Sequence, residues 1–154
     1  MQIREAIRYT LLICLFLIYS GTGAQSTQRS LLLVCRDNTT LESLTHAEVR
    51  KLFLGVPVTK TQMRLKPLVN ASDQLVTEVF LQQVIFMSKR EYERQLLSRV
   101  FRLGDQRPPV YEDTDLLVEA LLDTPGSVSF MWSEQVERQK GLKTLSVLWT
   151  DSTD

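Results

Sequence analysis

Short apolar runs that are typical of strands alternate with helical segments along this chain, and this alternation limits the fold more than any other feature. Residues 31–35 are continuously apolar and bounded by polar residues, as a strand buried on both faces would be. Residues 64–69, 127–132 and 143–149 alternate polar and apolar side chains with the two-residue period of a strand. The expected order is β-α-β-α-α-α-β-β, which predicts an α/β fold with a mostly parallel sheet flanked by helices.

The helical segments carry recognisable start and stop signals. Thr45 is followed three residues later by Glu48, and Ser88 by Glu91, so each pair can form a capping box at the first turn of a helix. Gly55 follows the first of these helices at a position where a residue free to adopt positive φ ends a helix well. We therefore expect helices to begin after Thr45 and after Ser88.

The first 24 residues differ from the rest of the chain. Arg4 and Arg8 precede an uncharged apolar run at residues 10–19, and small residues follow up to Ala24. This order is typical of a secretory signal peptide, and the run is shorter than the roughly 20 residues that span a bilayer. We expect residues 1–24 to be cleaved, which leaves no stable membrane span and a periplasmic or secreted protein. An uncleaved anchor is the alternative.

The remainder has the length of one domain. We expect a flexible leader at residues 25–30, the α/β domain at residues 31–149 and a frayed tail at residues 150–154. Cys35 is the only cysteine after the predicted signal peptide, so the domain has no internal disulfide. Its place in an apolar run predicts a buried, unreactive thiol.

The sequence lacks the signatures of catalysis and metal binding. His46 is the only histidine, and it stands in the first turn of a capped helix, where a surface residue is expected more than a general base. One histidine and the distant Cys35 cannot complete an ordinary metal site. We therefore expect no enzyme and no cofactor. The formal net charge of +0 also lacks the basic excess of a nucleic-acid-binding protein.

Charged residues gather at two of the predicted helices. Glu112, Asp113 and Asp115 stand at the start of a helix beginning at Asp113 or Thr114, where negative charge is favourable. The helix after Ser88 mixes both signs, which predicts a solvated face. Its charged residues are Lys89, Arg90, Glu91, Glu93, Arg94 and Arg99.

One junction between a strand and a helix is a candidate site for an anion. The predicted strand ends at Val69, and a helical pattern begins at Asp73. The start of a helix presents unpaired N–H groups and partial positive charge, which attract anions. The candidate ligand-binding residues are therefore Asn70, Ser72, Asp73 and Gln74. The alternative is that Ser72 acts only as the N-cap of the helix.

Four segments together resemble the phosphate ABC-transporter substrate-binding family, the two-lobed periplasmic proteins of the type II class. They are LTHAEVRKLFLGV (44–56), KPLVNASDQLVTEVFLQQV (66–84), VFRLGDQRPPV (100–110) and LLDTPGSVSFMWSEQV (121–136). The resemblance covers about residues 31–148. It implies one periplasmic-binding-protein-like lobe, with phosphate or a similar oxyanion bound at the junction described above.

The chain departs from this family in its length and in its binding loop. Full members have two lobes that close on the ligand, whereas this chain suffices for one. The family's arginine and aspartate align with Asn70 and Ser72, and its Ser-Gly-Thr aligns with residues 74–76. Loss of charge-assisted bonds predicts weak oxyanion binding at most.

Two hypotheses for function stay open. In the first, the chain is an exported, non-catalytic domain that binds phosphate or a similar oxyanion weakly. In the second, it is an accessory protein of the envelope that has lost its ligand and acts through a protein partner. A homodimer would supply a facing lobe and favour the first hypothesis.

Overall fold

The computed structural model describes residues 28–60 and 62–151. The predicted signal peptide, residues 1–24, lies outside the described residues, as do residues 25–27 of the predicted leader and residues 152–154 of the predicted tail. Among the described helices, none combines the length and the hydropathy that a membrane-crossing segment needs.

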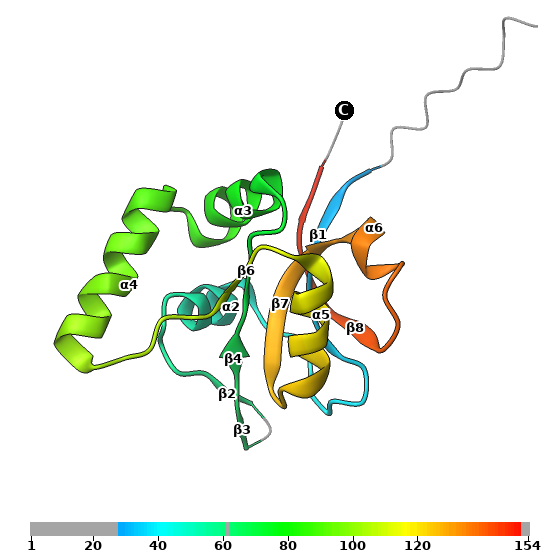
Figure 1. The fold of residues 1–154 in the computed structure, drawn as a ribbon, viewed down its shortest axis with the longest axis horizontal. Helices are drawn as coiled ribbons and strands as arrows, with labels where there is room; N and C mark the ends of the chain where they lie inside the picture. The colour runs from blue at the N-terminus through cyan, green and yellow to red at the C-terminus, as the bar shows by residue number, and fades with distance from the viewer. Residues whose placement is uncertain (1–27, 61, 152–154) are drawn as a thin grey trace, which may run out of the picture.

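A four-stranded sheet in the order β4-β7-β1-β8 forms the centre of the domain (Figure 1). Strand β1 (Ser30–Arg36) lies between β7 (Ser127–Trp132) and β8 (Leu142–Thr150) and is antiparallel to both. Short β4 (Lys66–Pro67) joins the edge parallel to β7. The α/β fold with flanking helices is confirmed, but the mostly parallel sheet is wrong, since two of the three pairings are antiparallel. An apolar run predicts burial and carries no information about the direction of its neighbours.

Helices cover both faces of this sheet (Figure 1). Alternation along β1 sends Leu31 and Leu33 to the layer that contains α2 (His46–Phe53), while Val34 packs in the layer of α5 (Thr114–Asp123). The two apolar layers explain why β1 has almost no polar side chain: each of its faces is covered.

Three aromatic rings in mutual contact join the elements of the larger layer. Phe80, the last residue of α3 (Gln74–Phe80), stacks on Phe130 with ring centroids 3.7 Å apart. Phe53 meets both rings edge-on, at 4.8 Å from Phe80 and 5.6 Å from Phe130. Because all three side chains are buried, this cluster ties α2, α3 and β7 into one core.

Both predicted capping boxes are confirmed. The Thr45 hydroxyl accepts a hydrogen bond from the N–H of Glu48, whose carboxylate accepts one from the N–H of Thr45. Ser88 and Glu91 make the same reciprocal pair at the start of α4 (Lys89–Leu103). Each box satisfies N–H groups that the first turn of a helix leaves free.

The predicted strand over residues 64–69 is divided among three short strands with different partners. β3 (Met63–Arg64) pairs with β2 (Thr59–Lys60), β4 pairs with β7, and β5 (Val69–Asn70) pairs parallel with β6 (Val110–Tyr111). An alternating pattern indicates extended backbone, but the bonding partner of each residue depends on segments far away in the chain.

The helix predicted to begin at Asp73 does not continue throughout as a regular α-helix. α3 ends at Phe80, and the chain continues as the π-helical turn η1 (Leu81–Ile85), which stops at Phe86 with φ of 58°. The structure also contains a short helix that the sequence analysis did not predict, α6 (Ser133–Val136), between β7 and β8.

The ordered pairing extends slightly beyond the predicted domain range of 31–149. Ser30 is paired with Thr150 across β1 and β8, and the N–H of Asp151 donates to the carbonyl of Arg29 at 2.8 Å. The two ends of the described domain therefore lie side by side (Figure 1).

Candidate functional site

The four predicted ligand residues, which we call the junction cluster, lie where β5 leads into α3. Asn70 is fully buried, and its Nδ2 donates to the carbonyl of Phe130 at 2.9 Å. Its Oδ1 accepts hydrogen bonds from the N–H of Ser72 at 3.0 Å and from the Ser72 hydroxyl at 2.7 Å. Both ends of this amide, and the Ser72 hydroxyl, therefore have partners inside the protein.

The N-cap of α3 is Asp73, not Ser72. Its Oδ1 accepts from the N–H of Leu75 at 3.0 Å, and its Oδ2 accepts from the indole Nε1 of Trp132 at 3.2 Å. A carboxylate is thus already placed at the positive end of the helix, where it satisfies an N–H group and offsets the helix dipole.

Gln74 is exposed and turned along the helix. Its Nε2 donates to Oε1 of Glu78, one turn later, at 2.8 Å. Thr77 Oγ1 donates to the carbonyl of Asn70 at 3.0 Å, which fixes the strand end to the first turn of α3. Thr77 and Trp132 are not among the residues predicted for this junction. For Trp132 no local signal exists, because it is 59 residues from Asp73.

A cleft of about 1000 Å³ lies beside the junction cluster, between α3, α4 and residues 107–112. Gln74 is the member of the junction cluster that reaches it. The apolar part of its lining includes Phe80, Phe130, Tyr92, Leu96 and Met87, and the charged part consists of Glu78, Lys89, Glu93, Arg107 and Glu112. We call this space the α3–α4 cleft.

The far wall of this cleft is α4, which is held to the body through a few side chains. The Tyr92 hydroxyl donates to the carbonyl of Phe53 at 2.9 Å, and its burial raises the pKa of this phenol. Arg99 donates to the carbonyl of Gly55 at 3.1 Å and to Asp105 at 2.7 Å. Arg99 was predicted to lie on a solvated face, and the structure instead uses it to attach the helix.

Other predicted residues neither belong to the junction cluster nor line the α3–α4 cleft. Cys35 is a buried free thiol, as expected, and burial raises its pKa. His46 is exposed, with Nε2 2.9 Å from the carbonyl of Leu148. Asp113 caps α5 by accepting from the N–H groups of Asp115 and Leu116. Within residues 28–60 and 62–151, no three His, Cys, Asp or Glu side chains are grouped to hold a metal ion.

Comparison with known proteins identifies the fold. No protein-family model and no curated protein sequence matches the chain. Among solved structures, an ABC-type phosphate transport receptor from Vibrio cholerae aligns with a TM-score of 0.53 at 13% identity, over 77% of this chain and 46% of the receptor.

Two further solved structures give a similar result. PstS from Borrelia burgdorferi aligns with a TM-score of 0.55 at 14% identity, over 77% of this chain and 47% of that protein. A possible phosphate binding protein from Planctomyces limnophilus DSM 3776 gives 0.51 at 17% identity, over 77% and 41%. The chain therefore has the fold of phosphate-binding ABC receptors and spans less than half of their length.

Proposed function

We propose that this chain is an exported, non-catalytic domain of the phosphate-receptor fold that acts through contacts with another protein and does not capture phosphate tightly. The observation that carries the proposal is the Asp73 carboxylate at the start of α3. This is the position that the sequence resemblance assigns to the ligand. Export rests on the signal pattern of residues 1–24.

The electrostatics at the junction cluster oppose an anion. A phosphate at this helix start would lie beside the Asp73 carboxylate. Because both groups are negatively charged, their repulsion at such close range weakens phosphate binding. The Leu75 N–H that the helix would offer is already bonded to Asp73. In the α3–α4 cleft, three carboxylates accompany two cations, so the lining gives no net attraction to an anion.

The composition of the cleft suits apolar groups better. Its floor contains the stacked rings of Phe80 and Phe130, and Tyr92 stands at the wall with its hydroxyl already bonded. Clefts of this kind bind apolar side chains whose burial stabilises the complex by about 25 cal/mol for each Å² removed from water. An apolar centre surrounded by a polar, solvent-accessible rim is typical of a protein-binding surface.

A second candidate function is weak binding of phosphate or a similar oxyanion by Asn70, Ser72, Asp73 and Gln74. It is favoured by the comparisons, because the aligned structures are described as phosphate receptors or as a possible phosphate binding protein. In this case the ligand would have to displace Asp73 from the helix start.

Calorimetric titration of the purified protein with phosphate and with sulfate distinguishes the two candidates. We expect no saturable heat in the millimolar range for the wild-type protein. Asp73→Asn removes the competing charge, and Asp113→Asn is the matched control, since Asp113 caps α5 in the same manner. Saturable binding by the wild type that changes in Asp73→Asn, and is unchanged in Asp113→Asn, would overturn the proposal and establish the oxyanion site.

A further inference from the structure

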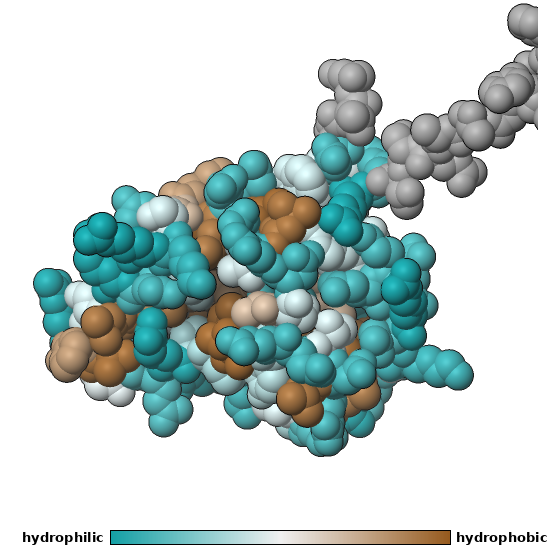
Figure 2. All heavy atoms as spheres, turned by 45° about the horizontal axis from the view of Figure 1, so that its top comes forward, coloured by the Kyte–Doolittle hydropathy of each residue, from teal (hydrophilic) through white to brown (hydrophobic). Residues whose placement is uncertain are grey.

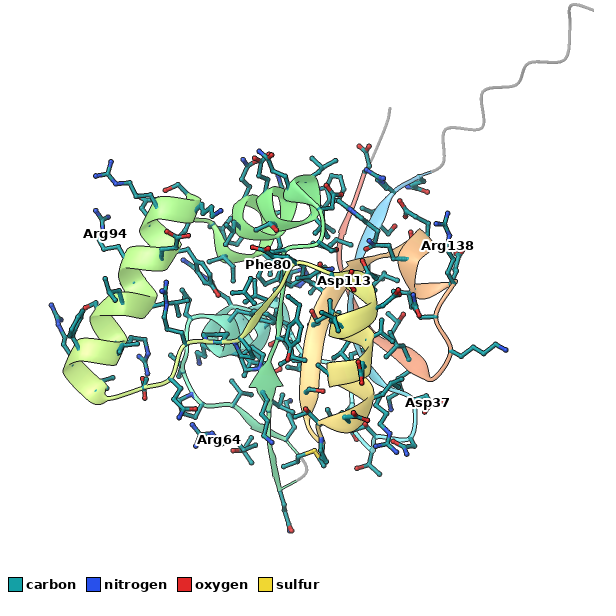
Figure 3. All side chains as sticks on the ribbon, viewed as in Figure 1. Asp37, Arg64, Phe80, Arg94, Asp113 and Arg138 are labelled. Atoms are coloured by element: carbon teal, nitrogen blue, oxygen red, sulfur yellow. The ribbon has the colours of Figure 1, made fainter. Side chains whose placement is uncertain are left out.

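The outer face of α4 carries cations and large apolar side chains that nothing in the domain covers. Arg90, Arg94, Leu97 and Phe101 follow a four-three-four spacing, which places them on one side of a helix. Leu97 is 45% exposed and Phe101 is 81% exposed. Figure 2 shows apolar side chains on the surface at the α4 end of the molecule, and in Figure 3 Arg94 points away from the body.

The outer face of α5 also combines exposed apolar and charged side chains, but its charges are negative. Leu116, Glu119 and Asp123 follow a three-four spacing on one side of the helix, and Glu112 stands just before it. Leu116 is 58% exposed, and the three acidic residues are exposed as well. A leucine thus stands among carboxylates here, where α4 has a leucine and a phenylalanine beside arginines.

The charges of the two helices are equal and opposite. α4 contains five basic and two acidic residues, an excess of three positive charges, and α5 contains three acidic residues and no basic one. The whole chain has a formal net charge of +0, so this separation is a feature of where the charges are placed. Complementary fields of this kind steer two surfaces together and align them.

Among the ion pairs formed by the described residues, none involves Arg90, Arg94, Glu119 or Asp123. Figure 1 shows α4 and α5 standing apart, with the segment that contains β6 running between them. The two faces therefore do not pair with each other in the monomer, and each is open to a partner surface of opposite charge.

We infer that the partner is a second copy of this chain, with the basic face of α4 packed against the acidic face of α5 in the other copy. Each copy has one face of each kind, so two such contacts related by a two-fold axis close a dimer. Phe101, Leu97 and Leu116 would form its apolar centre, and the arginine–carboxylate pairs its rim. The inference rests on the proposed function in one respect: it names the protein partner.

Sedimentation velocity of the purified protein tests this assembly through charge reversal. We expect the wild-type protein to form a concentration-dependent dimer that weakens in high salt, because screening reduces attraction between exposed charges. Arg90→Glu with Arg94→Glu should raise the dissociation constant at least about tenfold, as should Glu119→Arg with Asp123→Arg. The matched control is Arg138→Glu with Lys140→Glu, two exposed cations near α6, which should leave the dimer intact.

Combination of the reversals makes the test specific. The chain with all four substitutions should dimerise again, and an equimolar mixture of the two double variants should form a mixed dimer, since each supplies the charge that the other lacks. Circular dichroism of each variant checks that the fold is retained. A wild-type monomer up to about 1 mM, the weak end of specific affinities, would overturn the inference.

Two other outcomes also contradict it. A dimer that survives both reversals would use another surface. A wild-type monomer that binds vesicles rich in phosphatidylglycerol, and loses this binding in Arg90→Glu with Arg94→Glu, would assign the α4 face to an anionic membrane. A negative result for the dimer is distinguishable from a negative result for the proposed function, because the phosphate titration tests binding at the junction cluster and not at the outer faces of α4 and α5.

Discussion

Two strand-to-helix junctions lie next to each other in this domain and differ in how their helices are anchored. β5 and β6 pair in parallel, with Asn70 opposite Tyr111, and each leads into a helix capped by an aspartate. Asp113 bonds only to N–H groups of its own helix, α5. Asp73 divides its carboxylate between the Leu75 N–H of its own helix and the Trp132 indole of β7.

The difference shows how one local motif can have two roles. At α5 the cap is a property of four consecutive residues and offers nothing beyond the helix. At α3 the cap also accepts from the Trp132 indole of β7, and the neighbouring buried Asn70 donates to the carbonyl of Phe130 in the same strand. The junction that the sequence resemblance assigned to a ligand is therefore held by contacts of the protein with itself.

Among the substitutions that test this difference, replacement of Asn70 should cause the largest loss in the free energy of unfolding. Asn70→Ala leaves the carbonyl of Phe130 and the N–H of Ser72 without these partners in a buried site, so we expect a loss of about 2–3 kcal/mol in the free energy of unfolding. Urea denaturation followed by circular dichroism measures it. Ser72→Ala, which removes one hydroxyl, serves as the control and should cost about 1 kcal/mol or less. Equal losses in the two variants would mean that the buried amide has no special role.

The two caps should differ in strength. Asp113→Ala removes an N-cap and should cost about 1 kcal/mol, whereas Asp73→Ala also deprives a buried indole of its acceptor and should cost about 2 kcal/mol. The same urea experiment measures both. If Asp113→Ala were the more destabilising variant, the α3 junction would not be the more firmly anchored one.

A double-mutant cycle isolates the tertiary part of the Asp73 cap. Trp132→Phe keeps an aromatic ring and removes the indole N–H, with an expected loss of about 1 kcal/mol. Together with Asp73→Ala the losses should be less than additive, with a coupling of about 0.5–1 kcal/mol. Trp149→Phe is the control, because its ring packs edge-on against Trp132 at 6.2 Å without a bond to Asp73. Additive losses would argue against the hydrogen bond.

The smallest expected effect on stability comes from Glu48, in the capping box of α2, whose contribution depends on pH. The Lys60 ammonium and the Thr45 N–H lower the pKa of Glu48 from 4.5 to about 2. A carboxyl with a lowered folded-state pKa contributes stability that is complete above pH 4.5 and is lost as the pH falls toward 2. The difference in unfolding free energy between wild type and Glu48→Gln should therefore shrink over this interval. In Lys60→Met the loss should be smaller and should end at a higher pH, because the folded-state pKa of Glu48 then lies closer to 4.5. An unchanged profile would exclude Lys60 as the main cause.

Local patterns predicted the parts of the fold whose signals lie within a few residues. Thr45 and Glu48, or Ser88 and Glu91, are three residues apart, so the bonds that start their helices are visible in the sequence. The strand at residues 127–132 is confirmed for the same reason. The junction cluster was found as a strand-to-helix transition, which is also a local property.

The tertiary structure decided what joins these pieces. Asn70 meets Phe130 across 60 positions, Asp73 meets Trp132 across 59, and Arg99 meets Gly55 across 44. No hydrophobic period or motif spacing in the sequence predicts such contacts, because they depend on the order of the strands in the sheet. The antiparallel placement of β1 between β7 and β8 belongs here too.

By itself, then, the sequence determined that this chain forms an α/β domain with capped helices and a buried cysteine, because hydrophobic period and capping act over one or two turns. Only the tertiary structure decided that Asp73 and Asn70 are engaged by β7, and that Arg90, Arg94, Glu119 and Asp123 form no ion pair with other described residues. Both outcomes depend on packing between segments that are distant in the sequence. The three-dimensional arrangement, and not the local sequence pattern, determines which residues come into contact there.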